Sequence, residues 1–121
     1  MTEKNQQTIL KDTIVSAIQE KKGKELVVLD MSNLEQSITD YFIICHGDSN
    51  IQVDAISEFI ERQIKTELHE NTIHKEGTEN SLWVLLDYGD VVVHVFQQEQ
   101  RSFYKLEELW ADAKIQHINE E

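Results

Sequence analysis

The sequence predicts an α/β (α+β) fold in which a mixed sheet of about five strands packs against helices. Three observations predict this class. Apolar residues recur at helical spacing in three segments, short β-prone runs lie between them, and the two longest runs are joined by a four-residue turn. The expected order is α-β-β-α-β-β-β-α, which is not the βαβαβ order of a doubly wound parallel sheet. The length of 121 residues predicts a single domain over 1–121 with polar termini.

Two helices and two strands are predicted in the first half of the chain. Helices are indicated where apolar residues recur three or four positions apart, and strands where β-branched and aromatic residues form short runs. Gly23 follows the first helix, and Ser49 with Gln52 forms a capping-box pattern at the start of the second. The predicted elements are a helix over 8–22, strands over 26–29 and 41–45, and a helix from about 49 to 69.

A β-hairpin dominates the second half of the chain. The apolar runs 82–86 and 91–96 flank Asp-Tyr-Gly-Asp at 87–90, a turn in which Gly89 is free to adopt positive φ. A further short strand is expected around Ile73, before the hairpin.

A last helix is predicted near the C-terminus, with Ser102 as its N-cap. Its apolar positions recur at helical spacing, and they are Phe103, Leu106, Leu109, Trp110 and Ala113. The tail from about Gln116 is polar, and we expect it to fray.

The chain is strongly acidic. Lys and Arg total 11 and Asp and Glu total 23, which gives a net charge of −12. Residues 1–25 carry five Lys and four acids, whereas residues 26–121 carry six basic and nineteen acidic residues. This charge disfavours nucleic acids and anionic membranes as partners, and no apolar run is long enough to span a bilayer. It suits a basic protein partner, or it only keeps the protein in solution.

No pattern of catalytic residues is found in the sequence. Strand-based two-metal sites need acids two positions apart, and no two of the 23 acids have that spacing. There is no G-x-S-x-G elbow and no H-x-x-x-H pair. We therefore expect no catalytic residue, no metal and no cofactor. The alternative is a magnesium-dependent nucleotidyltransferase whose rearranged metal site uses Asp87 and Asp90, and turn formation competes with that role.

Three local features have both a structural and a functional interpretation. The turn Gly47-Asp48-Ser49 precedes a helix, and a capping turn is favoured over a phosphate site because Asp48 would repel an anion. His94 lies among valines, which favours a hydrogen-bonded, half-buried side chain over a metal ligand. Cys45 follows an apolar run and is expected to be an inert core thiol, and a single cysteine fits the reducing cytoplasm.

Large aromatic residues gather in the last third of the chain, and aromatics are enriched at protein interfaces. Trp110 fits the stripe of the last helix and is expected in the core. Trp83 shares one face of its strand with Leu85 and Asp87, while Leu82, Val84 and Leu86 share the other. Both faces are apolar, so either helices cover both or one is reserved for a partner. For Trp83 and Tyr88, core and interface remain equally open.

Several of these segments resemble the ribosomal silencing factor family, also called Iojap-like. The resemblance extends from about residue 8 to 113, with the same order and spacing. The matching segments of the first half are Thr39-Asp40-Tyr41-Phe42-Ile43-Ile44, Gly47-x-Ser49 and Gln52-Val53-x-Ala55-Ile56. Those of the second half are Glu76-Gly77, the run from Trp83 to Phe96, and Arg101-x-Phe103-Tyr104-x-Leu106-Glu107-x-Leu109-Trp110-x-Asp112-Ala113.

The resemblance implies a nucleotidyltransferase-like fold without a working active site. It implies binding to the large ribosomal subunit at ribosomal protein fourteen, on the face that meets the small subunit. Occupying that face blocks subunit joining and lowers translation when nutrients are short. The resemblance also implies a possible homodimer, since several family members are homodimeric when free. An adaptor for another basic protein is a third, weaker interpretation.

Contact residues are carried over from the family to the matching positions of this chain. They are Trp83, Asp87, Tyr88, Asp90 and His94, with Glu76, Glu99, Arg101 and Tyr104 as neighbours. The chain departs from the family pattern at His46 and Asp48, where smaller or uncharged residues are usual. It also lacks the proline that is common just before Glu76-Gly77.

Overall fold

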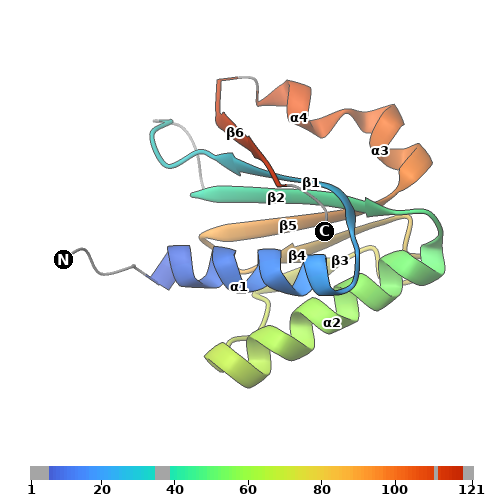
Figure 1. Ribbon diagram of the computed structural model, residues 1–121, viewed down its shortest axis with the longest axis horizontal. Helices are drawn as coiled ribbons and strands as arrows, with labels where there is room; N and C mark the ends of the chain where they lie inside the picture. Colours follow the sequence, from blue (N-terminus) through green and yellow to red (C-terminus); the bar gives the residue numbers. More distant parts are fainter. Residues whose placement is uncertain (1–5, 35–38, 111, 119–121) are drawn as a thin grey trace.

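The structure is a computed structural model, and it describes residues 6–34, 39–110 and 112–118 (Figure 1). These residues form one six-stranded sheet with helices packed against it. The elements are α1 (Gln6–Glu20), β1 (Lys24–Asp30), β2 (Tyr41–Gly47), α2 (Asn50–Leu68), β3 (His74–Glu76), β4 (Trp83–Asp87), β5 (Val91–Gln97), α3 (Gln98–Tyr104), α4 (Leu106–Leu109) and β6 (Lys114–His117).

The sheet is mixed, as predicted, and its strand order is β3-β4-β5-β2-β1-β6. The central strands β2 and β5 are parallel, and every other neighbouring pair is antiparallel. The parallel pair is joined through α2 and the β3–β4 segment, which supply the long crossover that parallel strands require. The predicted mixed α+β class is confirmed.

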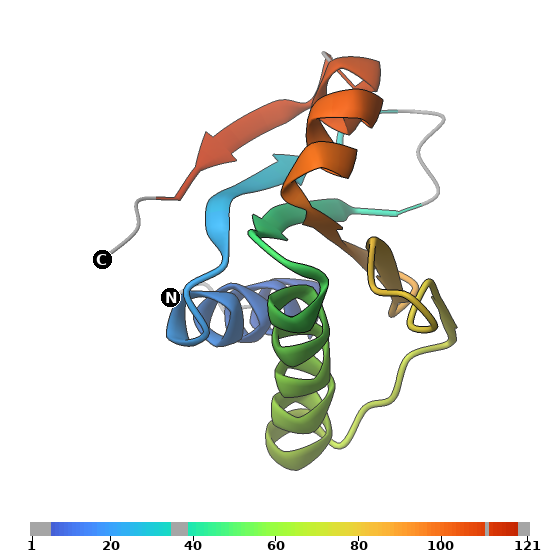
Figure 2. The same ribbon diagram turned by 90° about the vertical axis from the view of Figure 1, so that its right-hand side faces the viewer.

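Helices lie on both faces of the sheet, and two separate apolar clusters result (Figures 1 and 2). The long helices α1 and α2 cover one face, where Ile14, Ile56 and Ile60 pack on alternate residues of β2, β4 and β5. The short helices α3 and α4 lie on the opposite face, over a smaller cluster that includes Phe96 and Leu106. None of the helices in the described ranges is both long and apolar enough to cross a membrane.

The start of α2 has the predicted capping interactions in a shifted form. The Ser49 side chain accepts a hydrogen bond from the Gln52 N–H at 3.2 Å, and Gln52 Oε1 accepts one from the Asp48 N–H at 2.8 Å. Gln52 thus pairs with the residue before the N-cap instead of the N-cap itself. Two N–H groups of this turn are thus occupied by side-chain acceptors of the chain itself, which supports the capping interpretation.

The hairpin is formed by β4 and β5 with the turn at 87–90. The Tyr88 N–H donates to the Val91 carbonyl at 2.9 Å, and Gly89 adopts φ +93°. The short strand expected around Ile73 is β3, and the Ile73 N–H itself donates to the Asp87 carbonyl. The Asp90 carbonyl accepts from the N–H groups of Asp40 and Tyr41, which ties the turn to the start of β2.

The prediction of one last helix capped by Ser102 is wrong. Two short helices occur instead, and Ser102 lies inside the first of them. The N-cap is Gln97, whose side chain accepts from the Glu99 N–H, and the chain turns at Lys105, where φ is +47°. Glutamine is not a typical N-cap, and neither a Gly nor a Pro marks the break, so the sequence carried no signal for either boundary.

The prediction that the tail frays from about Gln116 is wrong for Gln116 and His117, which belong to the sixth strand, β6, while residues 119–121 of that tail lie outside the described residues. This strand pairs antiparallel with β1, from Asp30↔Lys114 to Val27↔His117, and the Ile118 N–H extends the pairing to the Leu26 carbonyl. All four of its residues are exposed. Because backbone hydrogen bonds to β1 hold the strand, it does not need to bury apolar side chains. Its sequence therefore lacks the apolar pattern that predicts a strand.

Substitution of Gly77 by Ala is expected to destabilise the fold by at least about 2 kcal/mol. Gly77 adopts φ +86°, and a Cβ there would lie 1.9 Å from the carbonyl oxygen of Trp83. Gly89→Ala is the matched control, since its φ is also positive but its Cβ would meet only the flexible end of Ile73, at 3.1 Å. We expect about 1 kcal/mol there. Equal losses in urea unfolding of the two variants would contradict the contact at Gly77.

Candidate interaction surface

Trp83 is the centre of an aromatic group on the α3 side of the sheet. Its half-buried indole stacks on Phe96, with ring centroids 4.8 Å apart, and it contacts the Tyr104 ring at the same separation. The Phe103 ring meets the Tyr104 ring edge to face at 5.1 Å. We call Trp83, Phe103 and Tyr104 the aromatic surface, since these rings are contiguous and Phe103 and Tyr104 are 77% and 46% exposed.

Strand alternation in β4 explains why Trp83 faces this side. Val84 and Leu86 are buried under the α1–α2 layer, while Trp83, Leu85 and Asp87 lie on the opposite face and stay partly exposed. The predicted alternation is therefore confirmed. Helices lie on both faces, but the short α3 and α4 leave the second face only partly covered. Trp110, which is expected in the core, is only partly buried and packs against this second cluster from the end of α4.

His94 is the diagonal neighbour of Trp83 on β5, and the indole Nε1 donates a hydrogen bond to its Nδ1 at 3.1 Å. The predicted hydrogen bond is confirmed, although the side chain is buried and not half-buried. Because Nδ1 accepts, the neutral ring carries its proton on Nε2, which has no hydrogen-bond partner among the described residues. Burial lowers the pKa of His94 to about 4. The ring therefore stays neutral and orients Trp83.

Tyr88 and Asp87 are separated from the aromatic surface. The Tyr88 side chain is buried in the other apolar cluster, with the α1 and α2 residues, and its burial raises its pKa. Asp87 Oδ1 accepts the Gly89 N–H at 2.7 Å, so this carboxylate shapes the turn. Asp90 is exposed beside it. The structure describes no group of three or more His, Cys, Asp or Glu residues that could hold a metal ion.

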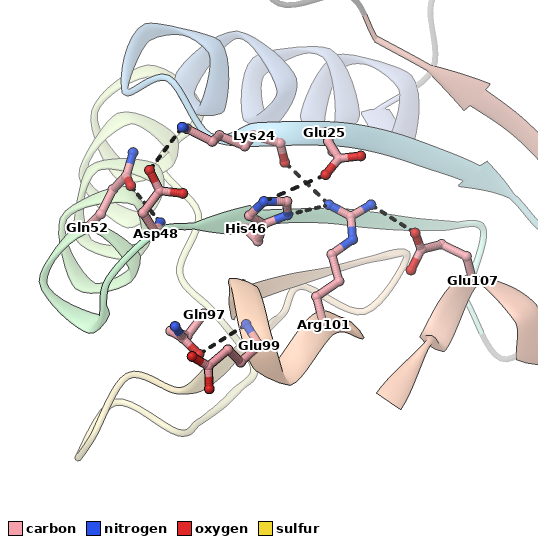
Figure 3. Close-up of polar contacts among 9 residues, drawn as sticks. All are labelled: Lys24, Glu25, His46, Asp48, Gln52, Gln97, Glu99, Arg101 and Glu107. Atoms are coloured by element: carbon pink, nitrogen blue, oxygen red, sulfur yellow. Dashed lines mark hydrogen bonds and ion pairs between the residues drawn. The ribbon is translucent and has the colours of Figure 1, made fainter. Parts of the chain in front are cut away.

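The remaining expected contact residues are spread over three places. Glu76 lies on the edge strand β3, exposed and paired with His74. Glu99 is exposed in the first turn of α3. Arg101 turns inward from the same helix and reaches between β1, β2 and α4 (Figure 3). Of the nine, Trp83, His94 and Tyr104 are brought into one group.

Two of the departures from the family pattern, His46 and Asp48, have partners in the structure. Buried His46 faces the Arg101 guanidinium, with Nδ1 3.1 Å from Nη1 (Figure 3). Exposed Asp48 forms an ion pair with Lys24 at 2.9 Å. Sequence reasoning did not assign a role to His46 or to Glu107, the other side-chain partner of Arg101. A long-range contact such as His46 with Arg101 leaves no local pattern that could have revealed it.

Cys45 is buried on the α1–α2 side of β2, and its burial raises the pKa of the thiol to about 12. A thiol with that pKa is protonated at neutral pH and is a poor nucleophile. The predicted inert core cysteine is confirmed.

The fold and this surface define a class: a small acidic α+β domain with exposed aromatic side chains on the less covered face of a mixed sheet. Comparison with known proteins then identifies the group within that class. The family described as "Ribosomal silencing factor during starvation" matches residues 3–121, and the chain belongs to this family.

Relatives and solved structures agree with this assignment. "Ribosomal silencing factor RsfS" of Bacillus subtilis is 43% identical over 118 residues, which are 95% of each chain. "Protein Iojap, chloroplastic" of Zea mays is 40% identical over 84% of this chain and 43% of that protein. A crystal structure of a Chromobacterium violaceum protein superposes with a TM-score of 0.82 at 36% identity, covering 88% of both chains.

Acidification is expected to destabilise the protein through His94. Its pKa is about 4 in the folded state and 6.5 ordinarily, so between these values the unfolded chain binds a proton that the folded chain does not. Each pH unit in this interval lowers the free energy of unfolding by about 1.4 kcal/mol, so at pH 4 it is about 3 kcal/mol lower than at pH 7. Urea unfolding from pH 7 to 4 measures this loss, and His94→Asn, which retains an acceptor for Trp83, removes it. Parallel pH profiles for the wild type and this variant would contradict the assignment.

Proposed function

We propose that this chain binds the large ribosomal subunit through ribosomal protein fourteen and sterically blocks joining of the small subunit. Translation is then lowered when nutrients are short. The observation that carries the proposal is the aromatic surface of Trp83, Phe103 and Tyr104 on an acidic body. The printed names of the relatives, ribosomal silencing factors, agree with a regulatory role.

The composition of the surface supports a protein partner. Solvent-exposed aromatic rings are typical of interface centres, and a polar rim surrounds such centres. Here acidic side chains lie nearby in the chain, since Glu99 is exposed on α3, the helix of Phe103 and Tyr104, and Glu108 is exposed on the following helix α4. A ribosomal protein is basic, so opposite charges would steer the encounter and fix its orientation.

The proposed mechanism is steric and needs no substrate or cofactor. The protein acts in the cytoplasm by occupying the face on which the subunits meet. When the protein is free, a second copy of the chain covers part of its surface in a homodimer. The exposed apolar side chains Phe103 and Leu109 support such pairing, since groups this large favour burial.

Trp83→Ala and Tyr104→Ala are each expected to weaken binding to purified large subunits by tenfold or more. Truncation removes a ring from the centre of the proposed contact, where single residues typically contribute more than about 1.4 kcal/mol. The measurement is fluorescence anisotropy of the labelled protein, titrated with subunits at two salt concentrations.

Ile51→Ala is the matched control, because Ile51 is 79% exposed but belongs to α2, which packs on the other face of the sheet. Its affinity should equal that of the wild type. If both ring variants, folded by circular dichroism, bind as the wild type does, the surface is assigned wrongly. Weaker binding at high salt is also expected, because the partner is basic.

A further inference from the structure

The Arg101 side chain is largely buried for a charged group, with one tenth of its side-chain area exposed. Its Nη1 donates to the Lys24 carbonyl at 3.3 Å and faces His46 Nδ1 at 3.1 Å. Its Nη2 donates to Glu107 Oε2 at 2.9 Å. One side chain of α3 is thus bound to β1, β2 and α4 together (Figure 3).

This anchoring matters because α3 has little apolar burial of its own. None of the residues from Gln98 to Tyr104 is buried, in contrast to α2, which buries five. A seven-residue helix is also too short to be stable by itself in water. The position of α3 therefore depends on two contacts, the Arg101 guanidinium on one side and the Tyr104 ring against Trp83 on the other.

The three acceptors require the guanidinium and not merely a positive charge. They lie in different directions, and the planar fork of an arginine can serve them together, whereas a lysine ammonium is a compact point charge. The contact also defines the state of His46. Arginine only donates, so His46 Nδ1 accepts and the proton is on Nε2, which faces Glu25 at 3.8 Å.

We propose that Arg101 is a positioning residue for the proposed ribosome contact. Its guanidinium holds α3 so that Tyr104 stays against Trp83, and it does not contact the partner itself. Only the expected effect of Arg101 on ribosome binding rests on the proposed function. The effect on α3 is a property of the free protein.

Hydrogen exchange of the free protein tests the effect on α3. In Arg101→Lys, the amides of residues 102–105 should exchange at least tenfold faster, while the amides of α2 keep their wild-type protection. A general loss of stability would instead raise exchange in both helices alike. Arg62→Lys, the same change at an exposed arginine of α2, should alter neither. Unchanged exchange at 102–105, or equal acceleration in α2, overturns the proposal.

Binding to large subunits tests whether Arg101 acts through Tyr104. Arg101→Lys keeps the charge and should weaken binding about tenfold without changing its salt dependence. In a Tyr104→Ala background the same change should weaken binding less than twofold further, since the ring that it positions is gone. Additive losses would show that Arg101 affects binding independently of Tyr104 and would overturn the proposal.

The two measurements separate this inference from the proposed function. If the wild type does not bind large subunits, the proposed function fails, and faster exchange at 102–105 still supports the role of Arg101 in holding α3. If binding occurs but exchange at 102–105 is unaffected by Arg101→Lys, the proposed function stands and the positioning role is wrong.

Discussion

The parallel pairing of β2 with β5 determines where the side chains of the aromatic surface lie. Its register, from Tyr41↔Val91 to Gly47↔Gln97, directs Cys45 and Val95 to one face and His46 and Phe96 to the other. It also brings the C-terminal ends of both strands to one edge of the sheet, where α2 and α3 begin on opposite faces (Figure 1). With β5 at the centre, β4 can bring Trp83 next to Phe96 and His94. A slip of one residue would exchange the two faces.

The two faces of the sheet differ in chemistry as well as in cover. The cluster under α1 and α2 is apolar and continuous, whereas the opposite face buries His94 among aromatic rings and His46 against the Arg101 guanidinium. Buried imidazoles contribute less to burial energy than apolar groups, but their hydrogen bonds fix orientation. On this face they orient Trp83 and receive Arg101. We infer that the first face mainly stabilises the fold and the second presents the contact.

The sequence predicted the elements that bury an apolar stripe or contain turn chemistry. The helix from Ser49, the hairpin at Gly89 and the alternation around Trp83 all have local signals, and the structure contains each of them. It did not predict β6, which is held by backbone pairing, or the break at Lys105. Of the contact residues expected from the family resemblance, Trp83, His94 and Tyr104 lie in one aromatic group. The resemblance could not show that Tyr88 and Arg101 point inward, because burial depends on partners distant in the sequence.

The central claim is that binding to the large subunit prevents subunit joining, and one sedimentation experiment tests it directly. Purified large subunits are mixed with the protein, small subunits are added, and the products are separated on a sucrose gradient. The account predicts that the protein sediments with free large subunits and that joined ribosomes decrease as its concentration rises. Joined ribosomes at an undiminished level, with the protein bound to large subunits or absent from them, would contradict the account.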